Sequence, residues 1–109
     1  MNITVDKTEN HAIVKAEGRL DTIHADNFEK QMLEVFESTK GEIILDCSGL
    51  EYISSTGLRV FLIVQKKMGT AARKFKICNL QPVIKEIFEV SGFNMVFSIF
   101  PDLNSALAS

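Results

Sequence analysis

The sequence carries little net charge, no long apolar run and no targeting segment. Its formal charge of −2 provides no basic field that would attract nucleic acid or anionic lipid. The longest apolar run, Val60–Val64, is far too short to cross a bilayer, and the first residues lack the basic and apolar segments of a signal peptide. We therefore expect a cytoplasmic protein that does not bind nucleic acid and does not insert into a membrane.

Motifs for nucleotide, metal or hydrolytic chemistry are also missing. Neither G-x-x-x-x-G-K-[ST] nor G-x-G-x-x-G occurs. His11 and His24 are isolated and lack the spacing of metal ligands, and the G-x-S-x-G elbow of serine hydrolases is absent. These absences predict a protein that is not an enzyme and needs no metal and no cofactor; an enzyme or nucleotide-binding protein is the alternative that they disfavour.

Only two cysteines are present, Cys47 and Cys78. Each stands beside an apolar run, and they form no CxxC motif. We expect both to be reduced residues of the core that react slowly with thiol reagents in the folded protein.

The residues that are present predict one α/β domain over positions 1–109. Hydrophobic residues make up 46% of the 109 positions and charged residues 24%, which suits one globular core. Alternating and helical apolar spacing predicts the order ββαβαβαβα. Interleaved strands and helices imply a mostly parallel, mixed sheet of four or five strands with about four helices. Strands are predicted near residues 3–5, 12–16, 43–45, 75–80 and 96–100, and helices over 22–40, 55–68, 82–91 and 101–107.

Several boundaries rest on single residues. Gly18 is expected to end the second strand, Asp46 to bound the third, and Gly69 to stop the helix over 55–68. In that helix the predicted core side consists of Val60, Phe61, Val64 and Met68. Ile63 falls among the charged residues of the opposite side, where it is either an ordinary exposed apolar residue or a contact for a partner.

The cluster Ser54-Ser55-Thr56-Gly57 follows a predicted strand and opens this helix. Its simplest interpretation is helix capping by a hydroxyl group. A sharper interpretation is phosphorylation, because a phosphate at a helix N-terminus meets free N–H groups and the positive end of the helix dipole. The two are compatible if Ser54 caps the helix and Ser55 stays exposed.

Residues 45–58, with the sequence LDCSGLEYISSTGL, resemble the signature segment of STAS domains, a name that joins sulfate transporters and anti-sigma factor antagonists. Gly18-Arg19-Leu20-Asp21 resembles the G-x-L-D of that family, and residues 79–93 resemble its later strand-to-helix stretch. The resemblance covers essentially the whole chain. It is closest to the stand-alone bacterial anti-sigma factor antagonists.

This resemblance implies a switch. In such proteins a partner anti-sigma factor, which is also a serine kinase, phosphorylates the serine before the [ST]-G pair, here Ser55. The unphosphorylated form binds that partner, a serine phosphatase restores it, and the kinase supplies the ATP. Ser54 stands where the family usually has Asp, so the capping group remains but its charge is lost. The expected partner surface comprises Asp21, Ser54, Thr56, Gly57, Arg59 and Ile63. The alternative function is a scaffold subunit of a membrane lipid-transport or transporter complex.

Overall fold

Strands and helices alternate along the chain, as the sequence pattern predicts. The computed structural model describes all residues from 1 to 109, and the predicted order ββαβαβαβα is confirmed with one added 3-10 turn, η1. The elements are β1 (Asn2–Lys7), β2 (His11–Leu20), α1 (Thr22–Ser38), β3 (Glu42–Ile53), α2 (Ser55–Thr70), β4 (Phe75–Cys78), α3 (Pro82–Val90), η1 (Phe93–Met95), β5 (Ser98–Phe100) and α4 (Leu103–Ala108).

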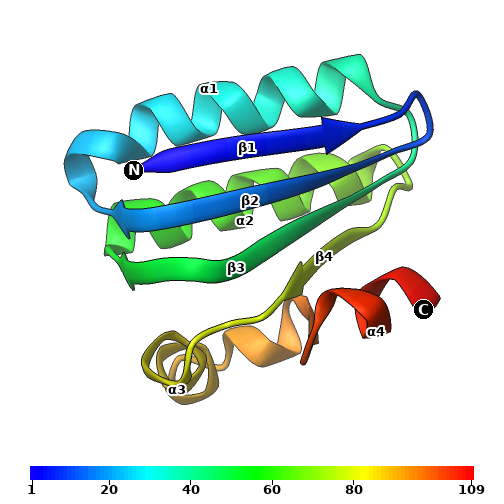
Figure 1. The fold of residues 1–109 in the computed structure, drawn as a ribbon. Helices are drawn as coiled ribbons and strands as arrows, with labels where there is room; N and C mark the ends of the chain where they lie inside the picture. The colour runs from blue at the N-terminus through cyan, green and yellow to red at the C-terminus, as the bar shows by residue number, and fades with distance from the viewer.

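The five strands form one mixed sheet in the order β1-β2-β3-β4-β5. Figure 1 labels the first four of them. The hairpin strands β1 and β2 are antiparallel, and every later neighbouring pair is parallel. Parallel neighbours need a crossover connection, and α1, α2 and α3 lie in those connections. The carboxyl ends of β2 and β3 therefore lie at the same end of the sheet.

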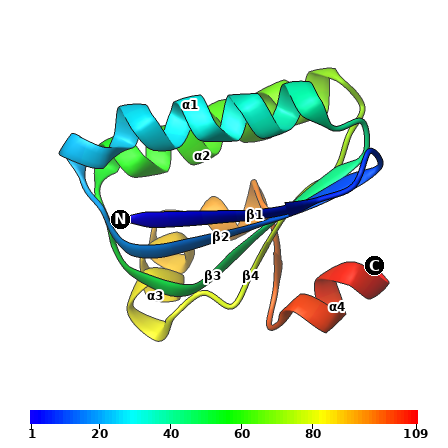
Figure 2. The same cartoon turned by 45° about the horizontal axis from the view of Figure 1, so that its top comes forward.

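The two faces of the sheet are covered by different helices. Helices α1 and α2 lie side by side on one face, and α4 lies on the other (Figure 2). Strand alternation explains this division. Ile43 and Leu45 of β3 join the main core, whereas Ile44 between them packs with Cys78 and Ala106 in a small separate cluster.

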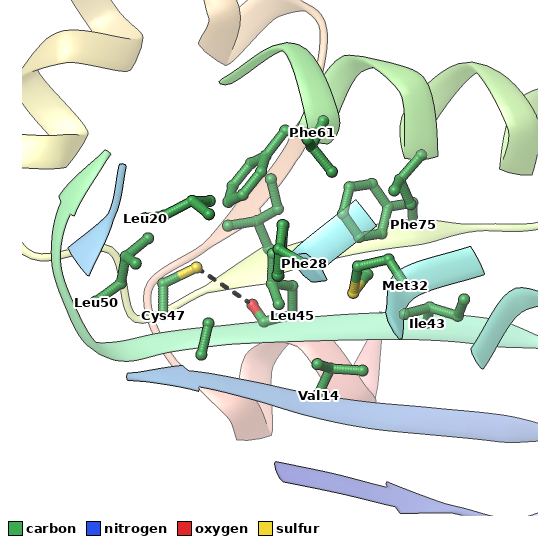
Figure 3. Packing of buried hydrophobic residues seen from close by; sticks show 14 of the residues in the cluster. Val14, Leu20, Phe28, Met32, Ile43, Leu45, Cys47, Leu50, Phe61 and Phe75 are labelled. Atoms are coloured by element: carbon green, nitrogen blue, oxygen red, sulfur yellow. Dashed lines mark hydrogen bonds between the residues drawn. The ribbon is translucent and has the colours of Figure 1, made fainter. Parts of the chain in front are cut away.

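Phe61 stands at the centre of the main core. It is completely buried, and its ring centre lies 5.8 Å from that of Phe28, 6.0 Å from Phe88 and 6.3 Å from Phe97. Figure 3 shows Phe61 and Phe28 above the strand that carries Leu45. These positions confirm the predicted phase of the helix over 55–68.

The cysteines are confirmed as buried free thiols. Cys47 belongs to the main core (Figure 3), whereas Cys78 belongs to the small cluster beneath α4. They occupy neighbouring strands but opposite faces of the sheet. Burial raises the pKa of Cys47, and burial together with the charges of Asp46 and Asp102 raises the pKa of Cys78 to about 12.

The prediction that Asp46 bounds the third strand is wrong, because β3 continues to Ile53. Asp46 is 4% exposed. Its Oδ1 accepts hydrogen bonds from the backbone N–H of Ser48 at 3.0 Å and from Nδ2 of Asn79 at 3.1 Å. A buried polar group is tolerated where such bonds are made, so the strand passes through this position.

The two predicted glycine stops, Gly18 and Gly69, are also corrected. Helix α2 runs through Gly69 to Thr70, and the residue with a left-handed backbone is Ala72, with φ of 56°. Gly18 lies inside β2 with φ of 97°, where the pairing with β3 shifts register. Gly18 therefore lies beside a bulge of the neighbouring strand β3 and does not end β2.

Candidate functional site at the N-terminus of α2

The turn between β3 and α2 consists of one residue, Ser54. Its backbone N–H donates to the carbonyl oxygen of Leu20 at 2.9 Å, which ties the turn to the end of β2. Its Oγ accepts a hydrogen bond from the N–H of Gly57 at 3.1 Å. Ser54 is thus the N-cap of α2, and it satisfies one of the free N–H groups at the helix start.

A row of three hydroxyl groups connects this turn to α1. The hydroxyls of Ser54 and Thr56 are 2.8 Å apart, and Oγ1 of Thr56 donates to Oγ1 of Thr22 at 3.3 Å. Since each hydroxyl carries one hydrogen, Ser54 donates to Thr56. The start of α2 is therefore held against the start of α1 by side-chain bonds.

Ser55 is the first residue of α2 and is exposed. The side-chain hydrogen bonds of the turn are made by its neighbours Ser54 and Thr56. The hydroxyl of Ser55 is thus the one hydroxyl of the cluster that makes none of these hydrogen bonds, and it stands at the positive end of the helix dipole on an exposed residue.

Gly57 is buried against the ends of β2 and β3. A Cβ at this position would lie 2.7 Å from Cγ of Leu20 and 3.0 Å from Cγ1 of Ile53. Such close approach requires a glycine. Gly57 therefore contributes to the predicted surface by letting the turn pack closely against the sheet.

Asp21 caps α1 at the same end of the sheet. Its Oδ1 accepts from the backbone N–H of His24 at 3.1 Å and lies 2.6 Å from Nδ1 of the same residue. Desolvation alone raises the pKa of Asp21, but the hydrogen bonds and charge of His24 outweigh it and lower the pKa below its ordinary value. Asp21 is thus an ionised, half-buried cap beside the hydroxyl row.

Arg59 and Ile63 follow Ser55 at intervals of one helical turn. Both line a groove of about 130 Å³ between α1 and α2, whose opposite wall includes Asp26 and Glu29. Arg59 is exposed and belongs to none of the ion pairs of the structure. Ile63 was expected to be exposed, but it is half-buried. Part of its side chain still lines the groove.

Three accessible residues near this turn were not predicted from the sequence. Ile23, in the first turn of α1, is 85% exposed. Arg19 lies over the ring of Tyr52 at the ends of β2 and β3, with its Cζ 4.2 Å from the ring centre. An apolar residue two positions after the capping Asp21, in the first turn of the helix, was the available signal for Ile23. No local pattern connects Arg19 with Tyr52.

Other kinds of site find no support in these residues. No group of three or more His, Cys, Asp and Glu side chains lies close enough to bind a metal ion. None of the helices has both the length and the apolar composition needed to cross a membrane.

Comparison with known proteins agrees with this fold. The family model described as STAS domain matches residues 2–106. BtrV of Bordetella bronchiseptica, named as an anti-sigma factor antagonist, is 35% identical over 109 residues, which are 100% of this chain and 91% of that protein. The crystal structure of an anti-sigma factor antagonist from Mycobacterium paratuberculosis aligns with a TM-score of 0.85 at 22% identity, covering 98% of this chain and 91% of that one.

A further similar structure is the phosphorylated form of SpoIIAA, a Bacillus cell fate determinant. It aligns with a TM-score of 0.74 at 15% identity, covering 98% of this chain and 97% of that one. The mixed five-stranded sheet, the order of the elements and the family match over nearly all residues lead to one assignment: the chain belongs to the STAS domain family.

Proposed function

We propose that this chain is an anti-sigma factor antagonist that binds a serine-kinase-type anti-sigma factor and is released by phosphorylation of Ser55. The observation that carries the proposal is the exposed Ser55 hydroxyl between two hydrogen-bonded hydroxyls at the start of α2. The name of BtrV, which is similar over the whole chain, supports the antagonist role. The phosphorylated form known for SpoIIAA supports the modification.

The geometry favours Ser55 over its neighbours as the phosphate acceptor. Phosphorylation of Ser54 would remove the hydroxyl that caps α2 through Gly57. Phosphorylation of Thr56 would break the row that leads to Thr22. A phosphate on Ser55 disturbs neither bond, so the switch can act without unfolding the domain.

Two opposing effects decide what the phosphate does. Inside the domain, the helix dipole and free N–H groups favour an anion by about 0.3–1 kcal/mol at an exposed site. Arg59, four residues later and without an ion pair, can lean back toward it, since helical side chains point toward the N-terminus. At the interface, an uncompensated charge of about −1.5 to −2 must be desolvated, which costs several kcal/mol. The interface penalty is larger, so partner binding weakens.

The proposed partner surface is the one that the sequence predicts: Asp21, Ser54, Thr56, Gly57, Arg59 and Ile63. The anti-sigma factor supplies the ATP as a kinase, and a serine phosphatase removes the phosphate. The chain acts by binding and needs no cofactor. We place it in the cytoplasm, where sigma factors act.

The direct test is incubation with a purified kinase-type anti-sigma factor and ATP, followed by mass spectrometry and a binding measurement. Phosphate should appear on Ser55, and the modified chain should bind at least about tenfold more weakly, which corresponds to about 1.4 kcal/mol. Ser55→Ala should bind constitutively and Ser55→Asp poorly. Ser98→Asp adds the same charge on the edge strand β5 and should bind normally.

Two outcomes would overturn the switch. One is phosphate found only on Ser54 or Thr56. The other is undiminished binding by the chain phosphorylated on Ser55. Either result would leave the scaffold function as the better hypothesis. Because Ser54 replaces the expected Asp, Ser54→Asp should restore a charged cap. The rate at which this variant is phosphorylated would show whether the kinase recognises that charge.

A further inference from the structure

We infer that Arg19 and Tyr52 form a second partner contact beside the Ser54 turn, which binds a carboxylate of the anti-sigma factor. This inference rests on the proposed function and adds a chemical requirement to it. The partner must place an Asp or Glu side chain against the ends of β2 and β3, in addition to its contact with Ser55.

The pair is built by a bulge in β3. Gly18 pairs with Leu50, but the next residue of β2, Arg19, pairs with Tyr52, so Glu51 is an extra residue. Without this bulge, Arg19 would stand opposite Glu51 and could form a cross-strand ion pair. The bulge replaces that carboxylate with an aromatic ring, and bulges commonly re-aim side chains in this way.

The guanidinium of Arg19 is therefore ordered but not neutralised. Its Cζ lies 4.2 Å from the centre of the Tyr52 ring, and Arg19 belongs to none of the three ion pairs of the structure. A guanidinium laid on a ring keeps its in-plane N–H donors, which match the two oxygens of a carboxylate. The missing group is thus an acid, and no residue of this chain supplies it.

Arg19 and Tyr52 are both accessible, and both lie near the Ser54–Ser55 turn. Arg19 is exposed and Tyr52 is 40% exposed. Leu20, directly after Arg19, accepts the hydrogen bond from the N–H of Ser54. Tyr and Arg are also the residue types most enriched among the side chains that dominate binding energy at interfaces.

The pair lies on the sheet face opposite α1 and α2. Leu20 and Ile53 are buried in the main core, so their strand neighbours Arg19 and Tyr52 face the other way. A partner that contacts both Ser55 and this pair must extend around the end of β2 and β3. The contact would then be separate from the helix groove that contains Arg59.

Tyr52 makes the inference directly testable, because the chain has one Tyr and no Trp. Carbon-13 labelling of tyrosine gives NMR ring signals from Tyr52 alone. Addition of an unlabelled, purified kinase-type anti-sigma factor should shift those signals. Arg19→Ala should weaken binding about tenfold, the scale of a residue that dominates an interface, and Arg19→Lys should recover part of the loss.

Lys15→Ala is the matched control. Lys15 is exposed on the same strand and, four residues earlier, on the same sheet face, so its removal changes the charge equally and should leave binding unchanged. Melting temperatures of all three variants should equal that of the wild-type chain. This inference alone would be overturned if a partner binds in a Ser55-dependent manner, does not shift the Tyr52 signals and binds Arg19→Ala with full affinity. Failure of the wild-type chain to bind any kinase-type anti-sigma factor would overturn the proposed function and this inference with it.

Discussion

The two faces of the sheet are held by different kinds of interaction. On the α1 and α2 face, a cluster of 22 buried residues includes Phe61 near its centre. On the α4 face, the separate cluster contains three buried residues, Ile44, Cys78 and Ala106. The same five strands therefore support one large apolar core and one small contact, which cannot derive its stability from apolar area alone.

On the α4 face, a buried lysine adds hydrogen bonds and an ion pair to the small apolar contact. Lys76 is 2% exposed, and its Nζ donates to the carbonyl oxygens of Ala106 at 2.7 Å and Ser109 at 2.9 Å. It also pairs with Glu42 at 3.0 Å. The last carbonyls of a helix lack partners within the helix. Lys76 bonds the carbonyl of Ala106 in the last turn of α4 and that of Ser109 just beyond it, and so attaches this short helix to β4. The comparison shows that packing holds one face and polar pairing the other.

The largest expected effect is on the apolar face. Phe61→Ala should lower the free energy of unfolding by about 3–5 kcal/mol, because it removes burial and leaves a cavity among three other rings. Leu62→Ala, at the half-buried neighbouring position, should cost about 1 kcal/mol. Urea unfolding of both variants measures the difference. Equal costs would show that the core does not depend on Phe61.

The polar face should respond differently to loss of Lys76. Lys76→Met removes both hydrogen bonds from Nζ to the end of α4, leaves the Ser109 carbonyl without this donor, and should cost about 1–3 kcal/mol. Because α4 then detaches more often, Cys78 should react faster with a thiol reagent while Cys47 keeps its slow rate. Lys74→Met, at an exposed neighbouring position, should change neither rate. Equal acceleration of both cysteines would mean that the two faces open together.

High pH tests both faces at once, since each holds one buried thiol. Folding raises the pKa of both cysteines, that of Cys78 to about 12, from about 8.5 in the unfolded chain. Their contribution to stability is fully present below about pH 8.5 and is lost as pH rises toward the folded pKa. Unfolding measured under reducing conditions should show a decline above about pH 8.5. The Cys47→Ala, Cys78→Ala double variant should show a weaker decline, and an equal decline would contradict the assignment.

The smallest effects on stability are expected at the proposed partner surface and at Ile23 beside it, outside both clusters. Ile23→Glu should change the free energy of unfolding by less than about 0.5 kcal/mol, because Ile23 is 85% exposed. Ile63→Glu should cost more, about 1 kcal/mol, since Ile63 is half-buried. Both should weaken binding to the anti-sigma factor. Thermal melting and a binding assay separate the two effects, and a large fall in melting temperature for Ile23→Glu would place that residue in the core.

The local pattern of residues was sufficient to predict much of the candidate site. The spacing of Val60, Phe61 and Val64 determined which side of α2 is buried, and the polar cluster before it determined where the helix begins. The capping role of Ser54 and the exposure of Ser55 follow from helix geometry over four residues. Such features depend on neighbours in the sequence, so they can be read from it directly.

Contacts between distant segments decided the rest. Asp46 stays in a strand because Asn79 bonds to it, and Thr56 is tied to α1 because Thr22 lies beside it. Arg19 meets Tyr52 because a bulge shifts the pairing of β2 with β3. A register shift of one residue exchanges the side chains that face each other, and its position is set by how the whole sheet packs. Neighbours along the chain were therefore enough to predict the fold class, the helix phase and the exposed serine. Which distant side chains meet one another depends on how the whole sheet packs, and it became visible in the folded structure alone.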